Sequence, residues 1–219
     1  MELFVQDVCK KIHGKTILDS ITLHLHGGYV YGFAGPNGCG KTMLFRALSG
    51  LMSIDSGIIA LNGKVLRQDF NVLPSLGIIL ENVGLFPGLT GFQNLEYLAG
   101  MKRKIGKSEI RQAITRVGLD PNDRRTYKKY SLGMKQRLAI AQAIMEQPDV
   151  IMLDEPTNAL DRNGVKLIRK IIMEEKASGA LILLASHNPE DLCILADHVY
   201  EMENGSIIMS EVAYGKNED

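Results

Sequence analysis

The segment from Gly35 to Thr42 limits the possible folds of this chain more than any other feature. It matches the pattern G-x-x-x-x-G-K-[ST], in which glycines let consecutive backbone N–H groups converge on phosphate oxygens. An apolar run before it predicts a strand, and the residues after it predict a helix whose positive end faces the same anion. The motif therefore predicts a nucleotide site with Mg²⁺, made by Gly35, Pro36, Asn37, Gly38, Cys39, Gly40, Lys41 and Thr42.

A second apolar run ends in two carboxylates. Val150 to Leu153 predicts a buried strand, and Asp154 and Glu155 follow at its carboxyl end. Open α/β sheets bind ligands at that end, and two adjacent carboxylates there would repel each other without a cation between them. We therefore predict that Asp154 binds Mg²⁺ with Thr42, and that Glu155 is the general base that acts on water. Lys41 is predicted to contact the β- and γ-phosphates.

Strands alternate with helices over most of the chain. This alternation predicts the α/β class with a largely parallel sheet. Strand patterns lie at 3–8, 16–25, 30–34, 57–61, 76–80, 150–153 and 180–185, with a hairpin turn at Asn204-Gly205.

One stretch, from about 85 to 138, has no strand signal. It predicts helices at 94–99 and 108–117, the second with Ser108 as its N-cap and Gly118 as its stop. Further helices are predicted from near Ser131 to before Pro148, over 161–177 and near 189–195. The helical stretch is thus an insert within the α/β pattern.

Composition excludes several classes of protein. The 219 residues carry 25 basic and 25 acidic side chains, so the neutral total gives no reason to expect a nucleic-acid partner. The charge is uneven, with +9 over residues 101–137 and −7 over 190–219. No apolar run approaches the ~20 residues that cross a bilayer, and the first residues lack a leader pattern. Three unpatterned cysteines suit a reducing compartment, so we expect a cytoplasmic chain.

The motifs and their order resemble the ATP-binding subunits of ABC transporters over nearly the whole chain. The family's signature, usually LSGGQ, is similar to Tyr130-Ser131-Leu132-Gly133-Met134, and Lys135-Gln136-Arg137 follows it. The Walker B motif runs on as Leu153-Asp154-Glu155-Pro156-Thr157. The D-loop is similar to Asn158-Ala159-Leu160-Asp161, and the switch histidine to His187.

The resemblance implies a P-loop NTPase (RecA-like) core with an antiparallel β subdomain and an inserted α-helical subdomain. Residues 1–219 are then a single ABC ATPase domain. Within it, 1–81 and 139–219 form the nucleotide-binding core with the β subdomain, and 82–138 form the helical subdomain that carries the signature.

The resemblance also implies an ATP-hydrolysing subunit that powers a separate permease. Two chains, identical or a pair with a sister ATPase, sandwich two ATP molecules head to tail. Ser131, Gly133 and Asp161 then belong to the nucleotide site, and His187 contacts the γ-phosphate beside Glu155. The permease holds the subunit at the inner face of the cell membrane. Residues 82–100 are the expected docking surface, with Phe86, Phe92 and Tyr97 as exposed aromatic candidates.

Several positions depart from the family pattern. Glu81 stands where glutamine is usual and is a third expected Mg²⁺ ligand. Leu132 replaces a signature glycine, so a positive φ there would be strained. Met134 replaces a glutamine and lacks its polar side chain. His13 is the expected adenine-stacking residue, and Phe4 is a less favoured substitute.

Other functions stay open at this point. The departures allow a degenerate cassette that binds ATP as a regulatory module. A non-transport ABC ATPase acting on ribosomes or DNA would usually carry two cassettes or a long coiled-coil insert. A P-loop kinase or GTPase would leave the signature and His187 unexplained. Within the family, the signature region is most similar to exporters of small peptides, antibiotics or multiple drugs.

Overall fold

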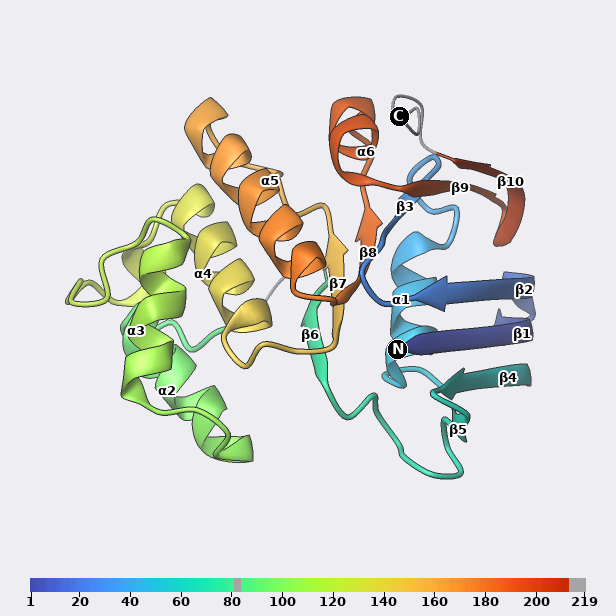
Figure 1. The fold of residues 1–219 in the computed structure, drawn as a ribbon, viewed down its shortest axis with the longest axis horizontal. Coiled ribbons are helices and arrows are strands. Elements are labelled where there is room, and N and C mark those ends of the chain that lie inside the picture. Colours follow the sequence, from blue (N-terminus) through green and yellow to red (C-terminus); the bar gives the residue numbers. More distant parts are fainter. Residues whose placement is uncertain (81–83, 213–219) are drawn as a thin grey trace.

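A six-stranded sheet forms the centre of the molecule in the computed structural model, which describes residues 1–80 and 84–212 (Figure 1). Its order is β10-β9-β3-β8-β7-β6, and all neighbours are parallel except the hairpin pair β9–β10. The predicted α/β class is confirmed. The bounds are β3 Val30–Ala34, β6 Leu76–Ile79, β7 Val150–Asp154, β8 Leu181–Ala185, β9 His198–Glu203 and β10 Ser206–Val212.

A second, antiparallel sheet has the order β2-β1-β4-β5. Asn62 and Gly63 form the tight turn between its last two strands, both with positive φ, as a two-residue hairpin turn requires. The strands are β1 Glu2–Ile12, β2 Lys15–His26, β4 Ser56–Leu61 and β5 Lys64–Val65.

Helices cover both faces of the central sheet. Figure 1 shows α1 between the two sheets, and α2, α3 and α4 gathered on the opposite side of the central sheet. The six α-helices within the described ranges are α1 Lys41–Ser49, α2 Gly91–Lys102, α3 Lys107–Arg116, α4 Leu132–Ile144, α5 Arg162–Ala177 and α6 Pro189–Leu195.

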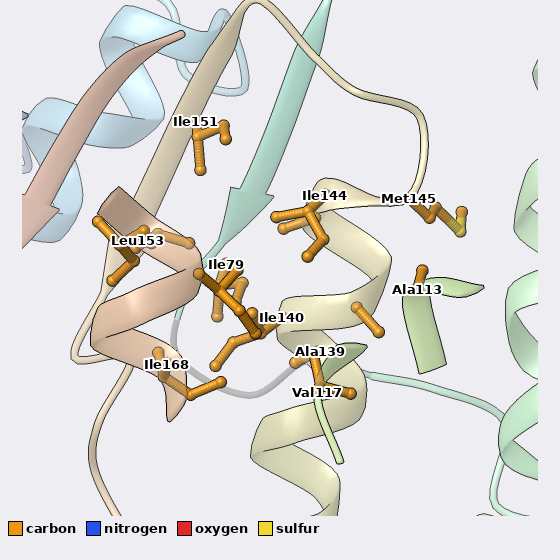
Figure 2. Close-up of a cluster of buried hydrophobic side chains, with 14 of the residues drawn as sticks. Ile79, Ala113, Val117, Ala139, Ile140, Ile144, Met145, Ile151, Leu153 and Ile168 are labelled. Atoms are coloured by element: carbon orange, nitrogen blue, oxygen red, sulfur yellow. The ribbon is translucent and has the colours of Figure 1, made fainter. Parts of the chain in front are cut away.

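The alternation of side chains along β7 connects two hydrophobic cores. Val150 and Met152 face the core that contains α1 and the antiparallel sheet. Ile151 and Leu153 face the other core, which also contains Ile140 of α4, Ala113 of α3 and Ile168 of α5 (Figure 2). Because β7 is buried on both faces, its apolar run is continuous, as is usual for a central parallel strand.

Two helix starts differ from the sequence prediction. Helix α3 begins at Lys107, and the N-cap is Gly106 rather than Ser108, because the Glu109 carboxylate accepts the Gly106 N–H at 3.0 Å. Helix α2 begins at Gly91, three residues earlier than predicted, because Thr90 and Gln93 form a capping box there.

None of the helices in residues 1–80 and 84–212 is both long enough and apolar enough to cross a membrane.

The close approach of β6 to α4 gives a stability prediction. A Cβ added at Gly77 would lie 1.9 Å from the backbone oxygen of Ala143 in α4. We expect Gly77→Ala to lower the free energy of unfolding by about 1–3 kcal/mol, because the helix must move off the sheet. Urea denaturation measures this loss.

A matched glycine-to-alanine substitution in α2 should change the free energy of unfolding in the opposite direction. Gly100 lies exposed in α2 with no heavy atom within 4 Å of an added Cβ. Gly100→Ala should therefore raise the free energy of unfolding by about 0.5–1 kcal/mol. Equal stability of the two variants would contradict the packing of α4 on β6.

Candidate functional site

The loop between β3 and α1 has a backbone conformation that residues with side chains rarely adopt. Gly35, Gly38 and Gly40 all have positive φ. A Cβ at Gly35 would lie 2.3 Å from the backbone oxygen of Met202 in β9. The glycines therefore allow a tight loop, packed against β9, that ends at the first turn of α1.

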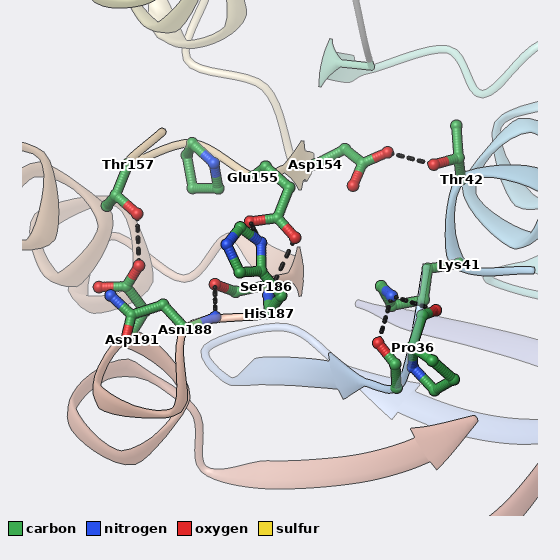
Figure 3. Close-up of polar contacts among 12 residues, drawn as sticks. Pro36, Lys41, Thr42, Asp154, Glu155, Thr157, Ser186, His187, Asn188 and Asp191 are labelled. Carbon is green, nitrogen blue, oxygen red and sulfur yellow. Dashed lines mark hydrogen bonds and ion pairs between the residues drawn. The ribbon is translucent and has the colours of Figure 1, made fainter. Parts of the chain in front are cut away.

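Lys41, the first residue of α1, turns its side chain back over this loop. Its ammonium donates hydrogen bonds to the backbone oxygens of Gly35 at 2.7 Å and Pro36 at 3.2 Å (Figure 3). The loop is also held from outside, because the Gly205 N–H in the β9–β10 turn donates to the Cys39 oxygen at 2.8 Å. The loop thus places a buried cation at the positive end of a helix, where a phosphate is favoured.

Thr42 and Asp154 meet although they are 112 residues apart. The Thr42 hydroxyl donates to Oδ2 of Asp154 at 2.5 Å. Strand register explains the meeting, because Phe33 of β3 and Asp154 of β7 both pair with Ala185 of β8. The three strands therefore end at one level, so the Thr42 hydroxyl in the first turn of α1 meets the Asp154 carboxylate at the end of β7, and both are groups of the kind that bind Mg²⁺.

Glu155 and His187 form the second contact at this edge. Oε1 of Glu155 accepts the backbone N–H of His187 at 2.9 Å, and Oε2 lies 2.8 Å from the Nδ1 atom of its imidazole (Figure 3). Glu155 has a positive φ of 51°, which is unusual for a residue with a side chain. Its own N–H donates to the Ala185 oxygen at 2.9 Å and so holds this backbone in place.

A cleft of about 530 Å³ joins these groups. Lys41, Thr42, Asp154, Glu155 and His187 all line it. Sequence reasoning assigned no site role to three further residues of its lining, which are Ile17, Met43 and Arg46. Of these, Arg46 could have been found, because it lies one helical turn after Thr42 on α1. Asn158 also lines the cleft, and it belongs to the segment that the sequence identified as the D-loop.

Other predicted nucleotide residues lie elsewhere. His13 is exposed in the turn between β1 and β2, with a φ of 48°. Phe4 packs edge-to-face against His24 on the antiparallel sheet, with ring centroids 5.9 Å apart. The adenine contact by His13 thus stays a prediction. Glu81 lies outside the described residues, so its expected metal contact also stays a prediction.

The signature residues begin α4. Ser131 is the N-cap, and its hydroxyl accepts the Met134 N–H at 3.2 Å. Leu132 is the first helical residue and has no positive φ, so the backbone strain considered for it is absent. The cause is the Ser131 cap, which starts the helix one residue before Gly133. A Cβ at Gly133 would lie 3.0 Å from the Ala159 oxygen, so α4 begins in close contact with the D-loop.

A second cavity, of about 560 Å³, lies beside these signature residues. Ser131 and Gly133 line it, together with an ion pair of Asp123 and Arg125. Hydrogen bonds from Arg125 lower the pKa of the Asp123 carboxyl. The Arg125 guanidinium also lies 3.8 Å from the Met134 sulfur, where the family pattern has a glutamine. Signature residues and the phosphate-binding loop therefore line two different hollows of one chain.

Two side-chain bridges connect α4 to the loop after β7. Gln136 donates to the backbone oxygens of Glu155 at 3.3 Å and Pro156 at 3.1 Å. Asp161 caps α5 by accepting the Gly164 N–H at 3.0 Å, and it accepts Arg137 at 2.9 Å. Asp161 is thus tied within its own chain, and its place in the nucleotide site stays a prediction. Gln136 was part of the motif but had no predicted role.

Comparisons with known proteins agree on one family. The family model described as ABC transporter matches residues 18–158. An uncharacterized ABC transporter ATP-binding protein of Bacillus subtilis, YybJ, is 44% identical, and the match covers 97% of this chain and 98% of YybJ. The lantibiotic transport ATP-binding protein SrtF of Streptococcus pyogenes is 36% identical, over 95% of this chain and 90% of SrtF. A bacterial ABC transporter cassette solved as a dimer has a TM-score of 0.87 at 20% identity, and the match covers 98% and 100% of the two chains.

The position of Lys41 gives a binding prediction. Lys41→Ala removes the cation at the phosphate-binding loop and should weaken ATP affinity at least about 10-fold, because hydrogen bonds to charged groups contribute about 1.5–3 kcal/mol. Isothermal titration calorimetry with ATP measures the change. Lys166→Ala, at an exposed lysine of α5, is the control and should leave the affinity unchanged. Unchanged affinity in Lys41→Ala would refute the phosphate-loop assignment.

Proposed function

The chain belongs to the ABC transporter family as one of its ATP-binding proteins, and on this premise we propose that two copies close around two ATP molecules to drive a separate membrane permease. The observation that carries the proposal is the cleft in which Lys41, the Thr42–Asp154 pair and the Glu155–His187 pair converge. The geometry supports hydrolysis rather than ATP binding alone, because the Glu155 carboxylate, which can accept a proton, lines the same cleft as Lys41.

Each side chain has a distinct task in the proposed reaction. Lys41 neutralises charge on the β- and γ-phosphates, and Thr42 and Asp154 would hold Mg²⁺, which screens phosphate charge when bound. Glu155 accepts the proton of the attacking water. His187 keeps the Glu155 carboxylate oriented through both of its oxygens, as the contacts at 2.9 and 2.8 Å indicate.

A second copy completes the site in this proposal. Ser131 and Gly133 start α4 beside their own cavity, away from the cleft that holds Lys41. A helix N-terminus with an exposed serine and a half-buried glycine in its first turn suits an anion. The dimeric cassette that shares this fold supports the same arrangement as an analogy.

An exposed apolar patch on α2 is the proposed contact with the permease. Phe86 and Tyr97 are half exposed and lie edge-to-face with ring centroids 4.9 Å apart, and Met101 is exposed one turn beyond Tyr97. Phe92 does not belong to the patch, because it packs against the core with the Arg111 guanidinium 4.8 Å from its ring. Docking here would transmit the motion of residues 82–138, moving as a unit, to the permease. It would also hold the chain at the cytoplasmic face of the membrane.

We propose that the transporter works as an exporter and that its cargo is a small peptide. SrtF, a relative that is similar over nearly the full length of both chains, carries the name of a lantibiotic transport protein. The signature variant SLGMKQR supports the same subgroup. The proposal therefore assigns the chain to an exporter of peptide antibiotics or similar compounds.

Substitution of the general base separates ATP binding from hydrolysis. Glu155→Gln keeps the shape of the side chain but cannot accept a proton from water. We expect turnover to fall at least about 100-fold and the protein to form a stable dimer in ATP. Size-exclusion chromatography with light scattering measures the dimer, and Lys41→Ala in the same background is the control that should stay monomeric. A monomer at saturating ATP would contradict the shared site.

The docking patch can be tested without disturbing the cleft. Tyr97→Glu places a charge in the patch and should abolish recovery of the chain with membranes, while ATP hydrolysis by the purified protein stays unchanged. Tyr29→Glu, at a similarly exposed tyrosine before β3, is the matched control. Crosslinking followed by mass spectrometry should identify a membrane-spanning protein with the wild type and with Tyr29→Glu, but not with Tyr97→Glu. Normal recovery of Tyr97→Glu with membranes would contradict this docking patch and would indicate that the permease contact lies elsewhere on the chain.

A further inference from the structure

A fully buried carboxylate in α6 has no part in the reaction described above. Asp191 is 0% exposed, and its Oδ2 accepts the hydroxyl of Thr157 (Figure 3). Its Oδ1 accepts the Nε–H of Arg169 of α5 at 2.7 Å and forms an ion pair with Nη2 of the same guanidinium, 2.6 Å away. Burial of a carboxylate is costly unless charged and hydrogen-bonding partners compensate. Because the partners of Asp191 come from the loop after β7 and from α5, its contacts hold these two segments and α6 in fixed relation.

Two of these segments carry the catalytic pair. Thr157 follows Glu155 by two residues, and Asp191 follows His187 by four. Glu155 and His187 already touch at 2.8 Å. Two contacts therefore join the segments 155–157 and 187–191. The contact between Glu155 and His187 joins them at one end, and the hydrogen bond between Thr157 and Asp191 joins them at the other.

The connection from His187 to Asp191 is short and stiff. The buried Ser186 hydroxyl accepts the Asn188 N–H at 3.1 Å, and the Asn188 side chain accepts the Glu190 N–H at 3.0 Å as the N-cap of α6. Movement of α6 would thus displace His187 directly.

The connection from Thr157 to Glu155 passes through strained backbone. Glu155 has a φ of 51°, a conformation that persists only where surrounding contacts enforce it. Gln136 holds the Glu155 and Pro156 carbonyls from one side. The Thr157 hydroxyl, bound to Asp191, holds the same loop from the other side.

We propose that Asp191 is a positioning residue for ATP hydrolysis, which acts through Thr157 to keep Glu155 and His187 in register. It touches neither nucleotide nor water in this role. The inference rests on the proposed function, since it concerns the same reaction. It assigns to Asp191 and Thr157 an effect on turnover that is separate from ATP binding.

Glu190 provides an internal control. It also pairs with Arg169, at 3.1 Å, but its side chain is 68% exposed and bonds no residue of the loop after β7 among the contacts of the described chain. Exposed ion pairs contribute little to stability. Glu190→Gln should therefore leave the catalytic pair in place.

Thr157 is the residue to test, because Asp191→Ala would leave the Arg169 guanidinium without its buried partner and destabilise the fold. Thr157→Val keeps the volume and removes the hydroxyl, whereas Thr157→Ser keeps the hydroxyl. We expect Thr157→Val to lower kcat about 10-fold or more with KM for ATP changed less than about 2-fold, because displacement of a base by about 1 Å has effects of this size. Thr157→Ser and Glu190→Gln should stay within about 2-fold of wild-type kcat.

Two controls make the outcome decisive. Thr157→Val in the Glu155→Gln background should still dimerise in ATP, which shows that its fold and nucleotide binding are intact. Equal kcat for Thr157→Val and Thr157→Ser, or a loss confined to KM, would overturn the positioning role. A wild-type chain without ATPase activity would refute the proposed function instead, so the two failures are distinguishable.

Discussion

The parallel alignment of β3, β8 and β7 is the constraint on which every group of the cleft depends. Because Phe33 and Asp154 both pair with Ala185, the loops that follow these three strands leave the sheet at one edge. The glycine loop before Lys41, Glu155 and His187 come from those three loops, and Asp154 is the last residue of β7. The alternating apolar residues of β7 secure the alignment, since they fill one core on each face.

Contacts between distant segments then set the orientation of the side chains. Thr42 and Asp154 are joined across 112 residues, and Gln136 brings the signature helix onto the backbone of Glu155. The strained backbone of Glu155 shows that the loop after β7 is held by its surroundings. A displacement of α4 would therefore reach Glu155, the proposed general base, and in the proposed function this contact is the physical route from a docked permease to hydrolysis.

Local patterns were sufficient to predict the strands, the glycine loop between β3 and α1, and the carboxylates at a strand end. Each of these depends on residues close together in sequence, such as the glycines before Lys41. The lining by Ile17 and the burial of Asp191 could not be predicted, because they depend on how β2 and α6 pack against segments far away in the chain. The starts of α2 and α3 were predicted wrongly for a smaller reason. Capping residues compete over two or three positions, and at α3 the Glu109 carboxylate decides the start in favour of Gly106.

The structure of the Glu155→Gln chain with ATP bound tests most directly whether a second copy completes the cleft. The expected result is a symmetric pair in which Ser131 of the partner subunit lies within hydrogen-bond distance, about 3 Å, of the γ-phosphate that Lys41 holds. ATP bound in a pair joined through another face, with both Ser131 side chains open to solvent, would contradict it.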